Sequence, residues 1–235
     1  MKYKQNFYAK YVKRILDIIL SGMALIVLSP IFVVLIIVGV VMMKGNPFFT
    51  QLRPGKDEKI FKLVKFCSMT NAKDKDGNLL PDDKRLTKYG KILRSTSLDE
   101  LPELWNILKG DMSIVGPRPQ LVRDMVFMSS EQRKRHSVRQ GLTGLAQVNG
   151  RNNMSWEKKM QYDLQYIENI TFWNDVKIVL KTVIKVFMRS DVVREGTASD
   201  VDLGEWLLQN GVISKEEYNK KQIEAKELIE GYTHV

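Results

Sequence analysis

Two adjacent carboxylates, Asp99 and Glu100, are the residues of this 235-residue chain whose types and spacing first suggest chemistry. They lie in the segment RSTSLDELPEL, and helix capping is the simpler interpretation. Ser97 and Glu100 have the spacing of a capping box, and acidic residues suit the positive end of a helix dipole. Pro102 is tolerated only in a first turn, which predicts a helix that begins close to Asp99. The buried face of this helix is expected to consist of Leu101, Leu104, Trp105 and Leu108.

The charge of the chain is positive and unevenly distributed. Lysine and arginine number 37 against 27 aspartates and glutamates, a net charge of +10. Residues 190–235 carry 5 basic and 10 acidic residues, which leaves 32 basic and 17 acidic residues in 1–189. A basic body favours anionic partners, namely nucleic acid, phosphorylated substrates or an acidic membrane surface.

Cysteine and histidine are scarce, which narrows the chemistry further. Cys67 is single, so an internal disulfide framework and a multi-cysteine zinc site are excluded, and a reducing compartment fits. His136 and His234 leave little for a histidine-based metal site or catalytic triad. His136, in the run EQRKRH, is expected to be a solvated surface residue.

Residues 15–43 form a long apolar segment, too long for a cleavable signal peptide. Three features argue against a simple membrane-spanning helix. A helix of this length reaches roughly 43 Å, whereas the hydrocarbon core is roughly 30 Å thick. Ser29-Pro30 interrupts the segment at its midpoint, and positive residues flank both ends, which the positive-inside rule does not allow for one crossing. A re-entrant helix broken at Ser29-Pro30 and a tilted, proline-kinked span are both left open.

The body is expected to combine one β-hairpin with helices and loops. PFFTQLRPGKDEKIFKLVKFCSM places Pro54-Gly55 between two apolar runs, which predicts the hairpin. A polar loop and a short helix around TKYGKILRS follow. GDMSIVGPRPQ is expected to be a loop stiffened by two prolines around Arg118, and RQGLTGLAQVNGRNN a second glycine-rich loop that ends on Arg151. Neither contains a P-loop or Rossmann fingerprint.

Two later segments have helical character. In residues 172–189, basic residues recur every four positions: Lys177, Lys181, Lys185 and Arg189. Aromatic and aliphatic residues occupy much of the remaining surface, which predicts a helix in the membrane interface, with an ordinary core helix as the alternative. In the acidic tail two short helices are expected, the second with a capping box at Ser214 and Glu217. The tail loosely resembles short two-helix oligomerisation modules.

Several motifs in order resemble the bacterial sugar transferases, the monotopic phosphoglycosyl transferases that begin glycan assembly on polyprenyl phosphate. Between about residue 10 and residue 189 these motifs are KRILD, the SP break, KLVKF, SLDELP, GDMSIVGPRP, GLTGLAQVNGR and YDLQYIENITFW. With the patterns above, the resemblance implies an α+β, mostly α-helical, monotopic membrane protein. Residues 1–45 are expected to form a re-entrant membrane helix, 46–189 a catalytic domain at the cytosolic face, and 190–235 an acidic helical extension.

The resemblance also implies an activity and a location. A sugar phosphate is expected to pass from a UDP-sugar to undecaprenyl phosphate, with release of UMP, at the cytoplasmic face of the bacterial plasma (inner) membrane. In this family pattern Asp99 corresponds to the nucleophile and Glu100 to a Mg²⁺ ligand, and the basic positions of the active site are Lys65, Arg94, Arg118 and Arg151. A carboxylate nucleophile splits phosphoryl transfer into two displacements through an acyl phosphate, and Mg²⁺ prefers carboxylate and phosphate oxygens. The capping and catalytic interpretations are compatible, since a helix N-terminus keeps a carboxylate ionised and stabilises charge on a phosphate.

Two residues depart from the family pattern, and several alternatives stay open. Cys67 stands where the family usually has arginine, and Glu103, expected at an exposed helix position, where it often has glutamine. Lys65 as a strand-edge surface residue, Arg94 as a structural ion-pair partner and Arg151 as a turn residue are the alternatives to binding roles.

The competing function is a catalytically silent, membrane-anchored scaffold of a glycan-assembly complex. Nucleic-acid binding is not expected, because no nucleic-acid motif is present. The identity of the sugar, the glycan pathway (capsule, O-antigen, exopolysaccharide or glycoprotein) and a homodimer formed through the tail are left open.

Overall fold

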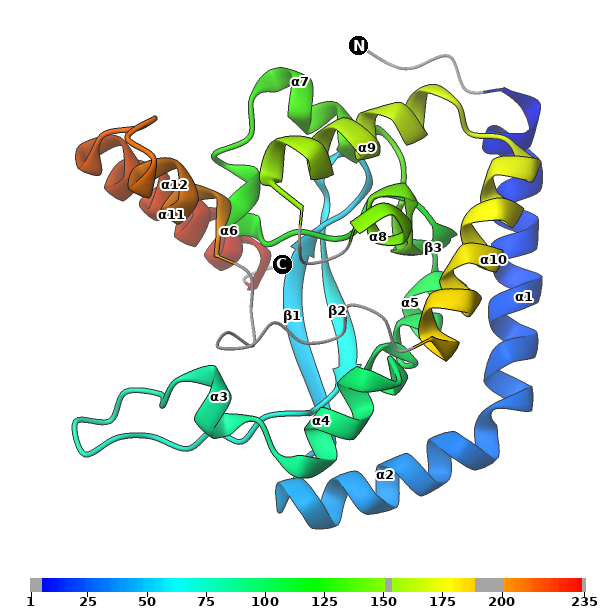
Figure 1. The fold of residues 1–235 in the computed structure, drawn as a ribbon, viewed down its shortest axis with the longest axis horizontal. Coiled ribbons are helices and arrows are strands. Elements are labelled where there is room, and N and C mark those ends of the chain that lie inside the picture. Colours follow the sequence, from blue (N-terminus) through cyan, green and yellow to red (C-terminus); the bar gives the residue numbers. More distant parts are fainter. Residues whose placement is uncertain (1–5, 151–153, 189–200, 234–235) are drawn as a thin grey trace.

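The structure, a computed structural model, describes residues 6–150, 154–188 and 201–233. Helices surround one antiparallel hairpin and one pair of short parallel strands, so the expected α+β, mostly helical class is confirmed (Figure 1). The strands are β1 (Phe48–Pro54), β2 (Ile60–Phe66), β3 (Met112–Val115) and β4 (Gln140–Thr143). The helices are α1 (Lys13–Val27), α2 (Ser29–Met43), α3 (Asp82–Arg85), α4 (Lys88–Ser95), α5 (Glu103–Lys109), α6 (Val122–Met125), α7 (Ser130–Arg133), α8 (Leu145–Gly150), α9 (Trp156–Glu168), α10 (Phe172–Phe187), α11 (Leu203–Gln209) and α12 (Lys215–Thr233).

The predicted hairpin is confirmed, and its register explains where Lys65 points. Strands β1 and β2 pair antiparallel from Phe48 opposite Phe66 to Pro54 opposite Ile60. Side chains alternate between the two faces of a strand, so Lys65 belongs to the same face as the buried Phe61 and Leu63. The lysine therefore continues an inward-facing series at the end of the strand.

The two glycine-rich segments were expected to be loops, which is confirmed for residues 116–121 around Arg118 and wrong for the parts that form strands and a helix. They contain β3 and β4, which pair in parallel with Ser113 opposite Gly141, and the second segment continues into α8. A Cβ atom on Gly141 would lie 2.1 Å from the Gly116 nitrogen, so only glycine allows the two backbones to approach this closely. Four-residue strands that pair across a long sequence separation leave little periodicity to detect.

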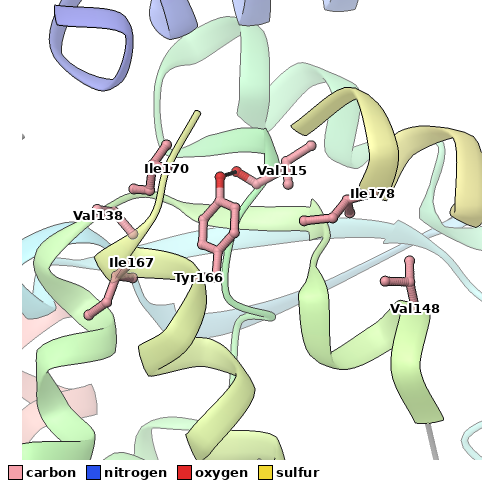
Figure 2. Packing of buried hydrophobic residues seen from close by; sticks show 7 residues of the cluster. All are labelled: Val115, Val138, Val148, Tyr166, Ile167, Ile170 and Ile178. Atoms are coloured by element: carbon pink, nitrogen blue, oxygen red, sulfur yellow. Dashed lines mark hydrogen bonds between the residues drawn. The ribbon is translucent and has the colours of Figure 1, made fainter. Parts of the chain in front are cut away.

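A core cluster packs around Val115 of β3 and attaches α8, α9 and α10 to the parallel strands (Figure 2). Its buried members are Val115, Val138, Val148, Tyr166, Ile167, Ile170 and Ile178. The Tyr166 hydroxyl lies 3.1 Å from the Val115 carbonyl oxygen, which satisfies the polar end of this aromatic side chain.

The long apolar segment is a bent pair of helices. Helices α1 and α2 meet at Leu28, directly before Ser29, and Pro30 occupies the first turn of α2, where its missing N–H costs no helical hydrogen bond. Within the described residues no single helix is long and apolar enough to cross a bilayer. The segments Tyr8–Val27 and Ser29–Met43, bent by 63°, meet that length and composition only together.

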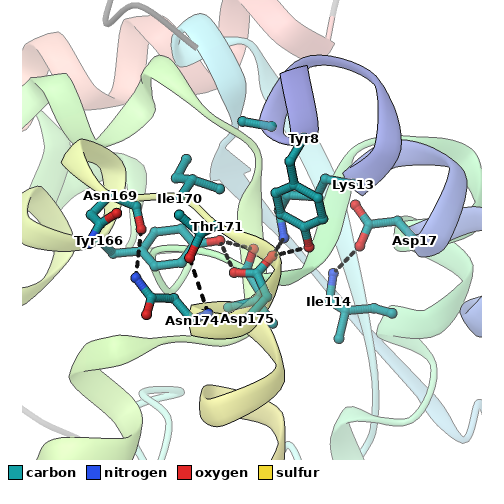
Figure 3. Close-up of polar contacts among 12 residues, drawn as sticks. Tyr8, Lys13, Asp17, Ile114, Tyr166, Asn169, Ile170, Thr171, Asn174 and Asp175 are labelled. Carbon is teal, nitrogen blue, oxygen red and sulfur yellow. Dashed lines mark hydrogen bonds and ion pairs between the residues drawn. The ribbon is translucent and has the colours of Figure 1, made fainter. Parts of the chain in front are cut away.

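One end of this pair is firmly attached to the body. Arg14 donates hydrogen bonds to the carbonyl oxygens of Ile107 and Leu108 at the end of α5, 2.6 and 2.9 Å away. The buried Asp17 carboxylate accepts from the Ile114 nitrogen at 2.9 Å (Figure 3). Many apolar side chains of the pair nevertheless remain exposed, among them Ile15, Ile19, Met23, Ile26, Val27, Val34, Ile37, Val41 and Met42.

Helix α10 runs beside α1, and a buried carboxylate joins the two (Figures 1 and 3). Asp175 Oδ2 accepts from the Tyr8 hydroxyl at 2.8 Å and from Lys13 Nζ at 2.6 Å. The Tyr166 hydroxyl lies 2.9 Å from the other carboxylate oxygen. Three donors therefore surround one buried acceptor group.

The outer face of α10 differs from that of an ordinary core helix. Its exposed apolar residues are Phe172, Trp173, Leu180, Val183 and Ile184. Lys177 and Lys181 are exposed with them, whereas Arg189 lies outside the described residues. A core helix would bury the apolar residues, so this distribution favours the interfacial interpretation over its alternative.

The acidic tail packs against the body through α6 and α9 (Figure 1). The shared core consists of Val126, Phe127, Met128, Trp156, Met160, Leu203 and Ala225. The second tail helix, α12, has 19 residues and is longer than expected. The Glu217 nitrogen donates to Ser214 Oγ at 3.1 Å, which is the capping bond predicted there. The division into three domains stays a prediction.

Candidate active site

A cavity of about 660 Å³ brings together residues from distant parts of the chain. Its lining includes Lys65 from β2, Arg94 from α4, Asp99 and Glu100, and Arg118 from the segment after β3. Five of the six predicted cationic and acidic site positions thus share one cavity. Arg151 lies outside the described residues.

The acidic pair sits in a 3-10 turn, Leu98–Glu100, and α5 begins only at Glu103. The predicted helix start close to Asp99 is therefore wrong for the α-helix, and Ser97 makes no capping hydrogen bond with its side chain. Pro102 has no N–H to donate, so the chain advances through i to i−3 bonds until Trp105 donates to the Pro102 carbonyl oxygen. Ser97 has a φ of 56°, in the left-handed region. This backbone conformation costs free energy for residues other than glycine, and such strained residues are often found at functional sites.

The face that α5 buries also differs from the expected one. Trp105 is 60% exposed, while Asn106 and Ile107 are buried with Leu104. The buried face is the one that contacts β2: Asn106 accepts from the Val64 nitrogen and donates to the Lys62 carbonyl oxygen.

Glu100 is held between two cations. Its Oε1 atom accepts from Lys65 Nζ at 2.9 Å and from Arg118 Nη2 at 2.7 Å. Burial alone would raise the pKa of Glu100, but Arg118 and Lys65 outweigh it and hold the pKa well below its ordinary value. In return, Glu100 is the largest influence on Arg118 and raises the pKa of its guanidinium. Glu100 is therefore ionised at neutral pH.

Glu103 is a member of this cluster that the sequence analysis placed on the surface. It is only 3% exposed, and its Oε1 lies 3.1 Å from Lys65 Nζ. Burial raises the pKa of Glu103 to about 7, an effect that Lys65 partly offsets. Its position four residues after Asp99 and three after Glu100 was the available signal, because such spacings share one helical face.

Asp99 differs from both glutamates, because no residue that the structure describes donates a hydrogen bond to its carboxylate or forms an ion pair with it. Burial and the neighbouring charge of Glu100 raise the pKa of Asp99. Lys65, Arg94 and Arg118 act in the opposite direction without contacting it. Asp99 is therefore a half-buried carboxylate that lies near three cations and forms no hydrogen bond or ion pair with a described residue.

Buried ion pairs fix the backbone that carries Arg118. Arg135 donates to the Arg118 carbonyl oxygen at 2.6 Å and to Asp163 at 2.7 and 2.9 Å. Arg53 donates to the Pro119 carbonyl oxygen at 3.2 Å. Burial, and then the charge of Arg118, lowers the pKa of Arg53 to about 10, so it remains protonated at neutral pH. The Arg118 side chain itself is 41% exposed and projects from this fixed backbone into the cavity.

Three residues of the site, Arg53, Arg135 and Asp163, were not predicted from the sequence. The run EQRKRH was interpreted as solvated, yet Arg135 and His136 are both buried, so the expectation for His136 was wrong. Burial, together with the positive charge of Arg135, lowers the pKa of His136 to about 3, which keeps this imidazole neutral. Local composition resembled a surface because the burial comes from packing against α9, which lies far along the chain.

Lys65, Arg94 and Cys67 each have a defined contact in the cavity. Lys65 is not a strand-edge surface residue, because both glutamates contact its ammonium group. Arg94 Nε donates to Ser68 Oγ at 3.0 Å. Cys67, where the family pattern has arginine, also lines the cavity, and its thiol donates to the Met69 carbonyl oxygen at 3.1 Å.

The carboxylates of this site can contribute only part of the coordination of a divalent cation. Within the described ranges, no group of three or more His, Cys, Asp or Glu side chains is arranged to hold a metal ion by itself. Mg²⁺, however, often binds through one or two carboxylates, several waters and the phosphates of a substrate. Among the described residues, both hydrogen bonds to Glu100 involve Oε1 and none involves Oε2. The residues thus fit a Mg²⁺ ion whose coordination a diphosphate completes.

Comparisons with known proteins agree with the geometry. The family model described as Bacterial sugar transferase matches residues 8–189. "Uncharacterized sugar transferase EpsL" of Bacillus subtilis (strain 168) is 49% identical over 162 residues, 68% of this chain and 80% of the relative. "UDP-glucose:undecaprenyl-phosphate glucose-1-phosphate transferase" of Klebsiella pneumoniae is 44% identical over 186 residues, 75% of this chain and 40% of the relative.

A third relative, "Undecaprenyl-phosphate galactose phosphotransferase" of Salmonella typhimurium (strain LT2), is 36% identical over 201 residues, 78% of this chain and 42% of the relative. The chain therefore spans less than half the length of the two relatives whose names state a reaction.

Proposed function

Because the chain belongs to the bacterial sugar transferase family, we propose that it transfers a sugar 1-phosphate from a UDP-sugar to undecaprenyl phosphate and releases UMP. The observation that carries this proposal is the contrast within the acidic pair: Glu100 Oε1 contacts two cations, whereas no described residue forms a hydrogen bond or an ion pair with the Asp99 carboxylate. The names of the relatives from Klebsiella and Salmonella support the same overall reaction.

Asp99 is the proposed nucleophile of two successive displacements. One of its oxygen atoms bonds to the β-phosphorus of the UDP-sugar, the bridging bond between the β-phosphorus and the α-phosphate oxygen breaks, and UMP leaves with that electron pair. A phosphate oxygen of undecaprenyl phosphate then attacks the phosphorus of the acyl phosphate. This step breaks the bond to Asp99, restores the carboxylate and forms the lipid diphosphate sugar.

The surrounding cations supply the charge stabilisation on which phosphoryl transfer depends. Arg118 is fixed at its backbone by Arg135 and Arg53, and its exposed planar fork suits two phosphate oxygens. Lys65 and Arg94 add further positive charge to the lining of the same cavity. Glu100 Oε2 and the substrate diphosphate would hold Mg²⁺, which supplies neutralisation of the negative charge on the phosphates.

The membrane placement is part of the same proposal. The lipid substrate requires the cavity to open near a bilayer. The bent pair α1–α2 and the outer face of α10 expose enough apolar surface to insert there, with lysines available for lipid phosphates. A re-entrant pair, with both ends on the cytoplasmic face of the bacterial plasma membrane, agrees with the positive residues on both sides of the segment.

The reaction is tested by UMP release from a panel of UDP-sugars, with and without undecaprenyl phosphate and Mg²⁺. We expect release that requires the metal and is sustained only with the lipid. With lipid withheld, the intact protein should gain the mass of one sugar phosphate, on a peptide that contains Asp99. No release from any donor would contradict the enzymatic function and favour the scaffold. Release without a covalent adduct would contradict the two-step route.

The topology is tested separately in intact cells, in a Cys67→Ser background. Lys10→Cys and Lys44→Cys place thiols at exposed positions on either side of the bent pair. Both are expected to be shielded from an impermeant thiol reagent and to react after permeabilisation. Labelling of one position alone in intact cells would mean that the segment crosses the membrane.

A further inference from the structure

The beginning of the tail forms part of the wall of the active-site cavity. Val201, Asp202 and Glu205 line the same cavity as Asp99 and Glu100. These tail residues lie beyond residue 189, where the match to the family model ends. In this chain, residues beyond the family match therefore form one wall of the cavity.

Several specific contacts anchor this wall. The Leu203 nitrogen donates to Asp124 Oδ1 at 2.9 Å, and Trp156 Nε1 donates to the Val201 carbonyl oxygen at 3.0 Å. Arg123 forms an ion pair with Asp202 at 2.9 Å. Gly204 lies so close to Phe127 that a Cβ atom would be 2.4 Å from the ring. The tail is therefore docked by hydrogen bonds, charge and shape together.

One buried carboxylate connects this wall to the catalytic loop. While Asp124 Oδ1 accepts from Leu203, its Oδ2 accepts from the Leu121 nitrogen at 3.0 Å. Leu121 follows the segment that carries Arg118. The position of the tail is thereby linked to the residues that we propose to hold the phosphates.

The lining of the cavity combines two kinds of chemistry. Lys65, Arg94 and Arg118 supply positive charge that suits phosphate oxygens. Of the basic residues that contact the tail or its neighbours, Arg123 is paired with Asp202, and Lys159 lies over the Trp156 ring, 5.2 Å from its centroid. The Glu205 carboxylate is exposed, and its contact within the described residues is a 3.3 Å hydrogen bond from Gln209.

A second, independent observation points to a ligand that donates hydrogen bonds. Within the described residues, the Oε1 atom of Gln147, which lines the cavity from α8 and is 8% exposed, is buried and has no hydrogen-bond partner. A buried acceptor without a partner is costly unless a ligand or water satisfies it. The exposed Glu205 carboxylate and this unpaired acceptor both favour a ligand that donates hydrogen bonds, so hydroxyl groups match this part of the lining better than further phosphate does.

We infer that the tail segment from Val201 to Glu205 is a substrate-binding wall that recognises vicinal hydroxyl groups of the donor nucleotide sugar. The inference rests on the proposed function and adds a recognition element that the family match does not contain. The hydroxyls belong either to the transferred sugar or to the ribose of the uridine. Both present the same pattern of donors to a carboxylate.

The test uses the full-length protein with Glu205→Gln, which removes the charge of one exposed side chain and keeps its size. Gln209→Ala is the matched control for the lost contact between Gln209 and Glu205, and Glu216→Gln, an exposed acidic residue on α12 outside the cavity, is the control for charge. We expect Glu205→Gln to raise the KM for the UDP-sugar about fivefold to tenfold with kcat within about twofold, since it weakens hydrogen bonds to a charged acceptor. Both controls should match the wild type.

Two further measurements locate the hydroxyls and separate this inference from the proposed function. If UMP inhibits the variant as strongly as the wild type, the sugar hydroxyls are recognised; if UMP inhibition weakens in parallel with KM, the ribose is recognised. Equilibrium dialysis with UDP-sugar, without lipid, measures the same loss of affinity independently of turnover. Unchanged KM and unchanged affinity in Glu205→Gln, with an active wild type, would overturn the inference alone. A wild type that binds UDP-sugar but releases no UMP would overturn the proposed function alone.

Discussion

Asp175 and Asp99 are both shielded carboxylates surrounded by cationic or hydroxyl groups, and they differ in what contacts them. Asp175 has Tyr8, Lys13 and Tyr166 within hydrogen-bond distance, and these partners come from the N-terminal helical segment and from α9. Asp99 has cations near it, but none in the described part of the chain forms an ion pair or a hydrogen bond with it. The oxygen atoms of Asp175 accept the hydrogen bonds that join α1 to α10. The oxygen atoms of Asp99 remain available to a ligand.

The same contrast separates Asp99 from its neighbour. Glu100 forms ion pairs with Lys65 and Arg118, and these pairs hold the two cations in place without a direct ion pair to Asp99. A carboxylate that formed strong ion pairs would be a weak nucleophile, because its lone pairs would already be engaged. The adjacent pair therefore divides two tasks that one residue could not combine.

The largest effect is expected from Asp99→Asn. It should lower lipid-dependent UMP release by at least about 10³-fold, since an amide cannot form the acyl phosphate. The melting temperature should stay within about 2 °C of the wild type, because Asp99 has no partner to lose among the described residues. Kinetic assays and thermal unfolding in the same detergent measure both. A variant with more than a tenth of the wild-type activity would remove Asp99 from the nucleophile role.

Asp175→Asn should show the opposite pattern. It leaves Lys13 partly buried without its counter-ion, which is expected to cost about 3 kcal/mol and to lower the melting temperature by about 10 °C. Activity per folded molecule at low temperature should be retained. The matched control is Asp57→Asn in the exposed hairpin turn, where φ is 54° and asparagine is well tolerated. Equal melting temperatures for the two variants would contradict the assigned role of Asp175.

Glu103 is expected to make the stability of the active-site cluster depend on pH. Its folded-state pKa of about 7 lies above the ordinary value of 4.5, so the folded chain binds more protons between these values. The contribution of Glu103 to the free energy of unfolding is therefore present below pH 4.5 and lost as the pH rises to about 7, on the order of 3 kcal/mol at most. Glu103→Gln should be relatively more stable at pH 8 than at pH 5 when compared with the wild type. Parallel pH profiles of the melting temperature would contradict this expectation.

Tyr8→Phe is the smallest and sharpest change. It removes one of the three donors around Asp175 and leaves the ion pair with Lys13 intact. We expect a loss of about 1 kcal/mol, or a decrease of roughly 2–4 °C in melting temperature, with unchanged kinetics. A loss as large as that of Asp175→Asn would mean that the hydroxyl, and not the ion pair, carries the contact between α1 and α10.

Local patterns predicted the elements that depend on neighbouring residues. The hairpin followed from a Pro54-Gly55 turn between alternating apolar residues, and the bend of the apolar pair from Ser29-Pro30. Errors arose where long-range packing overruled local composition. The charged run around His136 is buried against α9, and the two glycine-rich segments pair as parallel strands although 28 positions separate Ser113 from Gly141.

For the site, the sequence by itself determined which side chains are available: an adjacent carboxylate pair, cations at Lys65, Arg94 and Arg118, and their family pattern. Only the tertiary structure decided which carboxylate is engaged, that Glu103 is buried among them, and that the tail reaches the same cavity. Residue types and local turns are encoded within a few positions. The partner of a charge, and the burial that shifts its pKa, depend on segments that meet only when the chain folds.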